Sequence, residues 1–381
     1  MLSVLVFLFT YDIHLSLTFL VIACPGALVI SAPVSIVAGI GNAAKHGILI
    51  KGGHIMENLS KINAMVFDKT GTLTRGKPEV TEIRSYGISE KELLKLAADV
   101  EMASEHHLGT AIINKAHKEG IAYPKAPEKV QILKGGLHAL VDGEEIYIGN
   151  RQLLAKNKVS IPAEVEEFAL AREESGNTVI FIARGELVLG VISIMDQIRE
   201  HTFNTLHQLR QNGIDHMVML TGDNRRTAQK VATQLGIDQV FAELLPEEKL
   251  GKVQSCMKKG VKVAMVGDGV NDAPSIAAAN VGIAMGGAAT AATMETADVV
   301  LMAGNIQKLA YAQQLAIATV RNMKQNMLFS VAVVFLLLFG VLTGYVRLAS
   351  GMFIHEVSVL LVILNAVRLV RFPTYQLGIR K

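Results

Sequence analysis

An apolar run that stops at an aspartate constrains this chain more than any other stretch. Residues 64–67 read Ala-Met-Val-Phe, and Asp68 is followed by Lys-Thr-Gly-Thr-Leu-Thr. The run predicts a short buried strand, and the small polar residues predict a flexible loop. In open parallel sheets, ligands bind at this carboxyl end of the strands. A carboxylate there, beside the Lys69 ammonium and the amides that Gly71 frees, is suited to attack phosphorus and form an acyl phosphate. The competing interpretation is a surface turn capped by Asp68.

Two later apolar runs also end in loops that carry aspartates. Met-Val-Met-Leu at 217–220 precedes Thr-Gly-Asp, and Val-Ala-Met-Val at 263–266 precedes Gly-Asp-Gly-Val-Asn-Asp. Helical spacing at 224–237 and 246–259 supplies crossover connections. The three runs therefore predict a parallel sheet with polar side chains gathered at one edge. The residues expected there, besides Asp68, are Thr221, Asp223, Asp268 and Asp272.

The motifs D-K-T-G-T-L-T, T-G-D-N and G-D-G-V-N-D-A-P, in this order, resemble the phosphorylation domain of P-type ATPases. The resemblance implies a haloacid dehalogenase-like, Rossmann-like α/β fold in which ATP phosphorylates Asp68. Lys249, in Leu-Pro-Glu-Glu-Lys, would contact the transferring phosphoryl group as a point charge. Asp196 and Arg199 match a hinge motif of the family. The implied catalytic residues are Asp68, Lys69, Thr70, Thr221, Asp223, Lys249 and Asp272, and the implied Mg²⁺ ligands are Asp68, Thr70 and Asp268.

Position 70 separates two functions of this fold. Phosphatases that share it usually carry a second aspartate two residues after the nucleophile, as a general acid and base, and this chain has Thr70 there. An aspartyl phosphate would then persist and could drive a conformational change. A membrane-tethered phosphatase is the alternative function, and a non-transporting remnant or partner subunit is another.

Composition indicates a membrane protein. Half of the 381 residues are hydrophobic and 19% are charged, which is too apolar for an ordinary soluble domain. The net charge of +3 does not favour a nucleic-acid partner. Two cysteines, Cys24 and Cys256, exclude a disulfide framework.

The chain divides into membrane and cytosolic parts. Residues 1–11 are apolar but too few to span a bilayer, which needs about 20 residues. Basic residues near 45–51 and 321–324 flank the spans and favour a cytoplasmic main loop in a multi-pass plasma-membrane protein. The expected boundaries are a truncated membrane helix at 1–13, a membrane helix with a Cys-Pro-Gly break at 14–40, a cytosolic connector at 41–56, the phosphorylation domain at 57–77 and 192–308, a nucleotide-binding domain at 78–191, a second connector at 309–325, membrane helices at 326–346 and 352–371, and a cytosolic tail at 372–381.

The insert at 78–191 has a mixed pattern. Helical spacing occurs at 89–103 and near 163–174, and strand-like runs occur at 146–148 and 179–182. This mixture predicts an α+β lobe. In the resembling family, this position holds the nucleotide-binding domain. The residues that match its nucleotide site are Glu101, His106, Gly136, Gly149 and Asn150.

Two membrane segments carry candidate ligands for a transported ion. Proline in Cys24-Pro-Gly removes a backbone donor and breaks the helix, and transporters use such breaks for ion sites. The thiolate adds a soft ligand, although a plain kink beside a structural cysteine is the alternative. Cys-Pro-x is a mark of the heavy-metal P-type ATPases. His355, Glu356 and Ser358, in His-Glu-Val-Ser, resemble a segment of the cobalt-type subgroup. The alternative for His355 and Glu356 is a position near the membrane interface, where their side chains only snorkel towards water.

The sequence therefore predicts the C-terminal portion of a heavy-metal-exporting P-type ATPase. One thiolate with imidazole and carboxylate favours a divalent ion (Zn²⁺, Co²⁺, Cd²⁺ or Fe²⁺) over Cu⁺. ATP and Mg²⁺ are the expected cofactors, and the bilayer is the expected surrounding. The family's actuator loop, Thr-Gly-Glu, does not occur in these residues. The expected partner is the missing N-terminal half or another copy of the chain.

Overall fold

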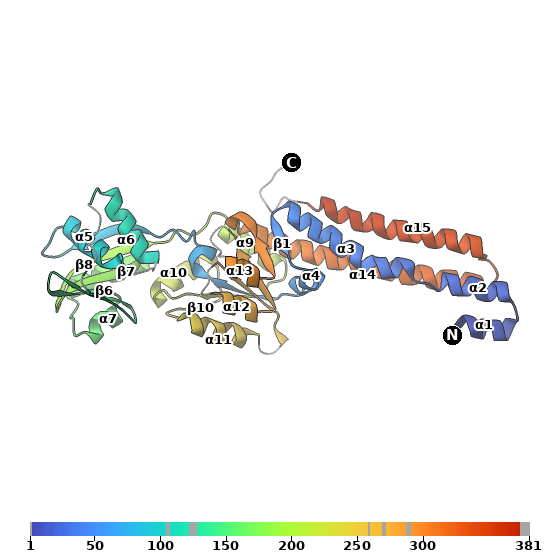
Figure 1. The fold of residues 1–381 in the computed structure, drawn as a ribbon, viewed down its shortest axis with the longest axis horizontal. Helices are drawn as coiled ribbons and strands as arrows, with labels where there is room; N and C mark the ends of the chain where they lie inside the picture. Colours follow the sequence, from blue (N-terminus) through green and yellow to red (C-terminus); the bar gives the residue numbers. More distant parts are fainter. Residues whose placement is uncertain are drawn as a thin grey trace.

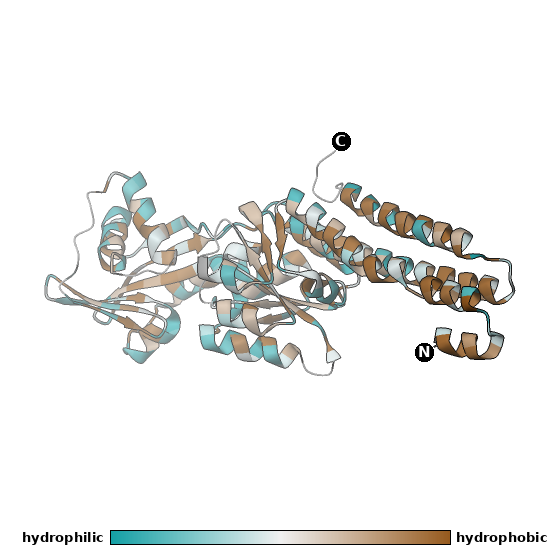
Figure 2. Cartoon of the chain, turned by 45° about the vertical axis from the view of Figure 1, so that its right-hand side comes forward, coloured by the Kyte–Doolittle hydropathy of each residue, from teal (hydrophilic) through white to brown (hydrophobic). Residues whose placement is uncertain are grey.

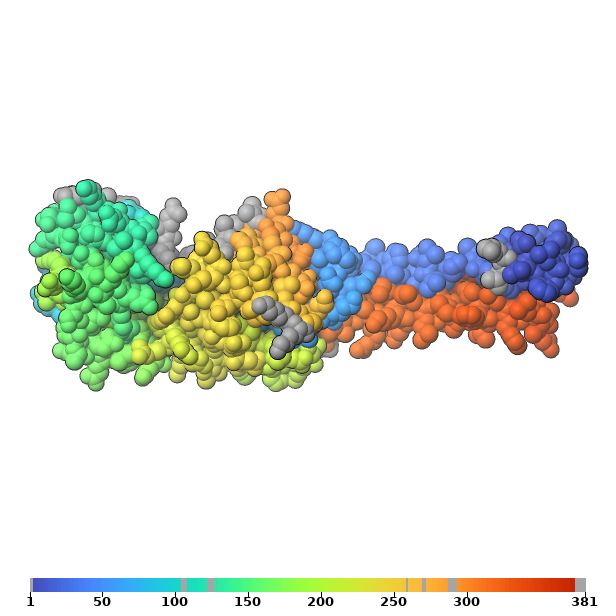
Figure 3. Space-filling model, turned by 90° about the horizontal axis from the view of Figure 1, so that it is seen from below, coloured from blue at the N-terminus to red at the C-terminus, as the bar shows by residue number. Residues whose placement is uncertain are grey.

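Three parts of the chain lie in a row (Figure 1). The computed structural model describes residues 2–103, 107–121, 127, 129–257, 260–268, 272–286 and 291–373. A central domain joins an inserted domain on one side and a helical bundle on the other. In Figure 3, the two broad domains narrow into the slender bundle. This arrangement confirms the predicted fold class, a membrane helical segment with an α/β domain that carries an α+β insert.

The central domain is built on a seven-stranded sheet of order β1-β13-β12-β11-β2-β9-β10. All neighbours are parallel except β1, which is antiparallel to β13. Every residue of the inner strands β2, β11 and β12 is buried, as expected for parallel strands covered on both faces. The strands are β1 (Ile48–Ile50), β2 (Ala64–Asp68), β9 (His216–Leu220), β10 (Gln239–Phe241), β11 (Val263–Gly267), β12 (Val281–Met285) and β13 (Val299–Leu301).

Helices cover both faces of this sheet. Met65 and Phe67 of β2 pack into one apolar core, and Ala64 and Val66 pack into another on the opposite face. This alternation follows from the two-residue period of a strand. The helices are α4 (Gly53–Leu59), α9 (Thr202–Gln211), α10 (Arg225–Leu235), α11 (Pro246–Cys256), α12 (Ala273–Ala278) and α13 (Ala291–Thr296), with short turns η1 (Lys69–Leu73) and η4 (Met302–Gly304).

The inserted domain is a six-stranded antiparallel sheet of order β3-β8-β7-β6-β5-β4. Its two faces carry separate cores, one under α5 and α6 and one under α7 and α8. The helices expected near 89–103 and 163–174 and the two expected strands are present. The elements are β3 (Glu79–Ser85), α5 (Glu90–Glu101), α6 (His107–Lys118), β4 (Lys129–Leu133), β5 (Gly136–Val141), β6 (Glu144–Gly149), α7 (Arg151–Lys156), α8 (Ala163–Glu174), β7 (Thr178–Arg184) and β8 (Leu187–Met195).

The helical bundle contains three helical segments that are long and apolar enough to cross a membrane: Ile13–Lys45, Gln307–Leu342 and Leu348–Arg371. Figure 2 shows that hydrophobic residues predominate along them. The first segment is broken at Cys24 and Pro25. The elements are α1 (Leu2–Thr10), α2 (Ile13–Ile22), α3 (Gly26–Lys45), α14 (Gln307–Leu342), α15 (Leu348–Val367) and η5 (Arg368–Arg371).

A buried amide network joins the three long helices. Ser35 Oγ of α3 donates to Asn322 Oδ1 of α14 at 2.9 Å. Asn326 Nδ2 donates to Ser35 Oγ at 3.2 Å and to Asn322 Oδ1 at 3.2 Å. Asn365 Nδ2 of α15 donates to Asn326 Oδ1 at 2.8 Å. Polar groups in hydrocarbon need such internal partners, so the network fixes how the helices meet.

Two segments expected to be connectors belong to regular elements. Within 41–56, residues 48–50 form the edge strand β1, because Ile48 and Ile50 face the core and pair with β13 while Leu49 is exposed. The range 309–325 lies inside α14, which runs unbroken for 36 residues. Its first half is apolar on the side that packs into the central core, so nothing there interrupts the helix.

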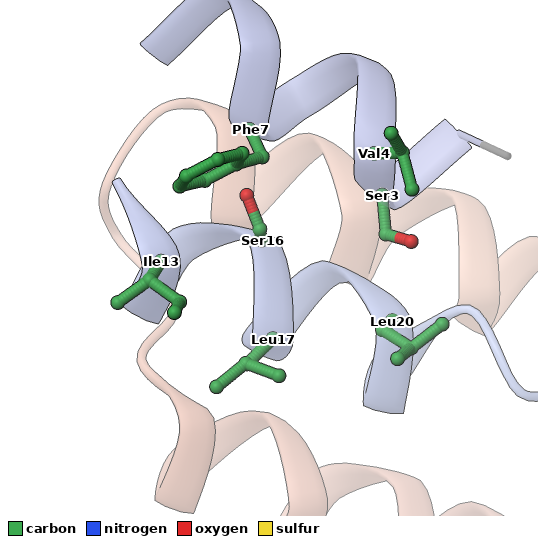
Figure 4. Close-up of a pocket in the computed structure, with 7 residues that line it drawn as sticks. All are labelled: Ser3, Val4, Phe7, Ile13, Ser16, Leu17 and Leu20. Atoms are coloured by element: carbon green, nitrogen blue, oxygen red, sulfur yellow. The ribbon is translucent and has the colours of Figure 1, made fainter. Parts of the chain in front are cut away.

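The expected membrane-helix remnant at the N-terminus is a short separate helix. The chain reverses at Tyr11, which has a positive φ of 54°, and α1 turns back along α2 (Figure 4). Asp12 caps α2 by accepting from Leu15 N at 3.0 Å. The two helices form an apolar groove lined by Ser3, Val4, Phe7, Ile13, Ser16, Leu17 and Leu20.

A glycine sets the distance between α3 and α14. A Cβ on Gly39 would lie 2.4 Å from Thr319 Oγ1, whereas a Cβ on Gly41 would meet nothing within 4 Å. Gly39→Leu should therefore separate the helices and cost the detergent-solubilised chain ~1–3 kcal/mol of unfolding free energy. Gly41→Leu is the matched control and should be near neutral. Equal losses in a denaturant titration of the two variants would contradict this packing.

Candidate active site

Asp68 stands at the carboxyl end of β2, an inner strand of the central domain's sheet. It follows four buried residues of β2 and is itself only 4% exposed. β2 pairs in parallel with β9 on one side and β11 on the other. The loops that follow these three strands therefore converge on Asp68, as the sequence predicts.

Gly71 lets the loop after Asp68 approach the third motif. Its φ is +72°, a conformation that favours glycine. A Cβ at this position would lie 1.5 Å from Asp268 Oδ2. Thr70, just before it, is half-buried and extended rather than helical. The glycine is thus required for the D-K-T-G loop and Asp268 to share one space.

Lys249 bridges two of the carboxylates. Its Nζ donates to Asp68 Oδ1 at 2.5 Å and to Asp272 Oδ1 at 2.9 Å. Burial lowers the pKa of Lys249, but the two carboxylates raise it further, and the net pKa is above its usual range. Lys249 is therefore charged, and it lies where a phosphoryl group on Asp68 would be.

Lys69 does not contact Asp68 in the way the sequence suggested. Its ammonium pairs with Asp223 of the second motif, and burial lowers its pKa. Asp223 is held in turn, because its backbone N donates to Thr221 Oγ1 at 3.1 Å. Lys69, Asp223 and Thr221 thus join two loops, and they order the site around the nucleophile.

Asp196 and Arg199 also hold the nucleophile's loop, beyond the hinge role that the family motif suggested. Asp196 Oδ2 accepts from Thr74 Oγ1 at 2.5 Å and from Gly76 N at 3.2 Å. Arg199 donates to the carbonyls of Gly71 at 2.5 Å and Thr72 at 3.1 Å. The contacts of both residues with this loop, and the proximity of Arg199 to Asp268, could not be read from their position in the sequence.

Three carboxylates lie close enough together to be candidate ligands for one cation. Ligand oxygens of Asp68, Asp268 and Asp272 lie within 4.8 Å of one another; in the described ranges no other group of metal-ligating side chains meets this condition. Burial, then the charge of Asp272, raises the pKa of Asp68 to about 7 and that of Asp268 to about 6. Clustered hard oxygens and excess negative charge fit Mg²⁺. Asp68 and Asp268 are two of the three ligands expected from the sequence, Thr70 being the third, and Asp272 lies within reach as well.

The structure describes four of the five candidate nucleotide residues. Gly136, Gly149 and Asn150 lie together at one corner of the inserted sheet, and Glu101 lies at the end of α5. Gly136 pairs with Gly149 on neighbouring strands, and Asn150 N donates to Gly135 O at 2.8 Å. A Cβ on Gly136 would lie 2.0 Å from Ile148 O, so glycine at this position lets the two neighbouring strands meet closely. Glu101 is buried at the end of α5. His106 lies outside the described residues.

Of the candidate ligands for a transported ion, His355 lies beside the Cys-Pro-Gly break, and in the described part of the chain no hydrogen bond joins the others to it across the helices. A Cβ on Gly26 would lie 2.9 Å from His355 Nε2, so this imidazole of α15 reaches the Cys-Pro-Gly break. Ser358 is buried, but its Oγ donates to His355 O at 2.6 Å, within its own helix. Cys24 and Glu356 are exposed on the bundle. His355 Nδ1 is buried without a hydrogen-bond partner, which leaves it available to a ligand.

Comparisons with known proteins show the family of this chain. A family model described as haloacid dehalogenase-like hydrolase matches residues 62–280. The chain is 40% identical over 364 residues to a probable cadmium-transporting ATPase of Staphylococcus aureus, covering 94% of this chain and 50% of that protein. The chain belongs to the haloacid dehalogenase-like hydrolases and, among them, to the heavy-metal P-type ATPases.

Other members of the heavy-metal P-type ATPases extend the comparison. A probable copper-importing P-type ATPase A of Enterococcus hirae is 44% identical over 317 residues, which cover 83% of this chain and 43% of that protein. The crystal structure of a zinc-transporting PIB-type ATPase in its E2·Pi state aligns with a TM-score of 0.74 at 38% identity, covering 94% of this chain and 58% of that one. The chain matches the C-terminal portion of this family and spans about half the length of the curated relatives. The three apolar segments are those of a membrane protein, with the catalytic domains on the cytosolic side.

The raised pKa of Asp68 predicts how its replacement changes stability with pH. Without Mg²⁺, the folded chain keeps this proton up to a pKa of about 7, whereas the ordinary value is 3.8. The folded state therefore binds more protons than the unfolded state between these values, so its stability falls as pH rises through them. Asp68→Asn cannot ionise, and at about pH 8 it should be more stable than the parent by on the order of 2–4 kcal/mol.

The measurement is thermal or denaturant unfolding in detergent, free of Mg²⁺, at about pH 5 and about pH 8. Asp215→Asn, at an exposed position before β9, is the matched control and should track the parent. An Asp68→Asn variant that is less stable than the parent at the higher pH would show that the carboxylate is not strained by burial.

Proposed function

We propose that this chain is the catalytic and ion-path portion of an ATP-driven heavy-metal exporter that works through a phosphoaspartate. The observation that carries the proposal is Lys249, whose ammonium bridges Asp68, at the end of β2, and Asp272. Phosphoryl transfer requires a carboxylate nucleophile, a fixed cation and a cluster of oxygen ligands, and these lie together at one buried edge of the sheet.

The residues divide the work of phosphoryl transfer. Asp68 Oδ attacks the γ-phosphorus of ATP, the bond to the bridging oxygen breaks, and ADP leaves. Lys249 stabilises the negative charge that spreads over the transferring group. Mg²⁺, held by Asp68 and Asp268, would neutralise phosphate charge when bound. Lys69, Thr221 and Asp223 keep the two flanking loops in place, and the corner at Gly136, Gly149 and Asn150 is the proposed support for the nucleotide.

A phosphatase of the same fold is less well supported. Hydrolysis needs a general base for the attacking water, and the position two residues after the nucleophile is Thr70. A long-lived acyl phosphate suits a pump, which converts it into movement. The continuous helix α14, which packs in the central core and then enters the bundle, provides the mechanical connection.

The proposed cargo is a divalent ion, Zn²⁺, Cd²⁺, Co²⁺ or Fe²⁺. The Cys24 thiol at the helix break and the His355 imidazole beside Gly26 supply one soft and one borderline ligand, with Glu356 and Ser358 as further candidates. Relatives described as cadmium-transporting and zinc-transporting support this choice, and relatives described as copper-importing and copper-exporting define the alternative. The proposed partner is the portion of these relatives that the match does not span.

The nucleophile can be tested by labelling. Incubated with Mg²⁺ and γ-labelled ATP, the chain should acquire an acid-stable, hydroxylamine-labile phosphate on Asp68. Asp68→Asn should lose the label, because the amide cannot form an acyl phosphate. Asp215→Asn, on the surface, should be labelled like the parent. Label that persists in Asp68→Asn would refute the assignment.

The cargo can be tested in a pump that carries this chain together with the rest of its family's architecture. ATP hydrolysis should be stimulated by Zn²⁺, Cd²⁺, Co²⁺ or Fe²⁺, and weakly by Cu⁺, because only one thiol stands at the break. Cys24→Ala should lower the metal-dependent rate by about tenfold or more. Cys256→Ala, in the central domain, is the matched control. Strong Cu⁺ stimulation that survives Cys24→Ala would contradict the proposed site.

A further inference from the structure

The inserted domain is joined to the central domain by a two-stranded ribbon. The outgoing and returning chains lie side by side, with β3 antiparallel to β8 and Thr74 paired with Ile198. Two-stranded ribbons vary more in twist than wider sheets do, so a ribbon alone sets the orientation of a domain weakly. A second contact is therefore needed to set the orientation of the inserted domain.

Glu173 makes that second contact. It lies near the end of α8, and its side chain is only 2% exposed. Its carboxylate accepts from Arg151 Nη1 of its own domain at 2.6 Å. It also accepts from Asn224 Nδ2 at 3.3 Å and is paired with Arg226 Nη1 at 3.4 Å, both at the start of α10 in the central domain. In Figure 1, α10 lies on the side of the central domain that faces the insert.

A neighbouring neutral hydrogen bond reinforces this contact. Thr227 Oγ1, fully buried in α10, donates to Asn177 O of the inserted domain at 2.6 Å. Asn177 is itself fixed, since its Oδ1 accepts from Thr81 Oγ1 at 2.7 Å. We call this set the α8–α10 clamp: Glu173 and Asn177 on one side, and Asn224, Arg226 and Thr227 on the other.

On the inserted side, the clamp is linked to the candidate nucleotide corner. Arg151 follows Asn150 directly in the chain. Its guanidinium is locked from three directions: it binds Glu173, its Nε donates to Glu166 Oε1 at 2.8 Å, and it stacks 5.1 Å over the Phe181 ring. A charge-assisted pair of this kind holds the backbone at Asn150 in register with Glu173.

On the central side, the clamp is linked to the phosphorylation loop. Asn224 follows Asp223, which pairs with Lys69 beside the nucleophile. Asn224 also caps α10, since its Oδ1 accepts from Thr227 N at 2.9 Å. One side-chain amide therefore serves the helix with its oxygen and Glu173 with its nitrogen, so the loop and the inserted domain are fixed together.

We propose that Glu173 is a positioning residue for phosphoryl transfer: through the α8–α10 clamp it holds the nucleotide-binding corner at a fixed orientation to Asp68. The inference rests on the proposed function, since it assumes that ATP bound to the inserted domain phosphorylates Asp68. Without the Glu173 charge, Arg151 and Arg226 face each other across the interface without a shared anion, and the insert turns away on its ribbon. Transfer from ATP is then slower, because small displacements of reacting groups carry large rate penalties.

The test compares two phosphoryl donors on the full chain in detergent micelles with Mg²⁺. ATP must be delivered by the inserted domain, whereas acetyl phosphate reaches Asp68 without it. Glu173→Gln and Thr227→Val, which break the clamp from opposite sides, should each slow labelling of Asp68 by ATP about fivefold or more. Labelling by acetyl phosphate should stay within about twofold of the parent. Equilibrium binding of a fluorescent ATP analogue should be unchanged, because the corner itself is intact.

Glu174→Gln is the matched control, because this carboxylate stands next to Glu173 at the end of α8 but is exposed. It should label like the parent with both donors. Equal labelling of Glu173→Gln and the parent by ATP would overturn the clamp, and so would an equal loss with both donors, which would indicate a damaged active site. A parent chain that neither donor labels would refute the proposed function, and the positioning role with it.

Discussion

The charge balance at the carboxyl edge of the central sheet, where Asp68 lies, depends on the ion pairs of Lys249 with Asp68 and Asp272. The ends of two parallel strands, β2 and β11, bring three carboxylates to one buried place, and repulsion and desolvation oppose their ionisation. One ammonium offsets part of that cost, protons on Asp68 and Asp268 offset another part, and a divalent cation would complete the balance. The site is therefore poised to bind a cation and an anionic phosphoryl group together, since each compensates the charge of the other.

The same edge is connected to the bundle by rigid elements. α14 carries Tyr311 and Leu315 in the central core and Asn322 and Asn326 in the amide network. A change in the loops around Asp68 can thus move a single continuous helix whose far end lies among the membrane segments. The contact of His355 with the Gly26 region places a candidate ion ligand at the break in the first span. Chemistry at one end and a ligand at the other are joined by packing rather than by a flexible linker.

The sequence predicted the features that local patterns encode. Apolar runs that end at aspartates predicted β2, β9 and β11 and the convergence of their loops, because parallel strands in one sheet share a carboxyl edge. It did not predict β1, whose three residues become a strand only when β13 is beside them. Nor did it predict that Lys69 pairs with Asp223, or that Glu173 reaches Arg226. Such contacts join residues far apart in the chain, and no periodicity records them.

Proton release on Mg²⁺ binding tests the shared charge balance most directly. The pKa values of about 7 for Asp68 and about 6 for Asp268 mean that, near pH 6.5, the two groups together hold about one proton. Titration calorimetry with Mg²⁺ in buffers of different ionisation enthalpy should therefore detect about one proton released per ion bound, and markedly less for Asp68→Asn. Mg²⁺ binding without proton release, or with the same release in Asp68→Asn, would contradict a site in which Asp68 exchanges its proton for the cation.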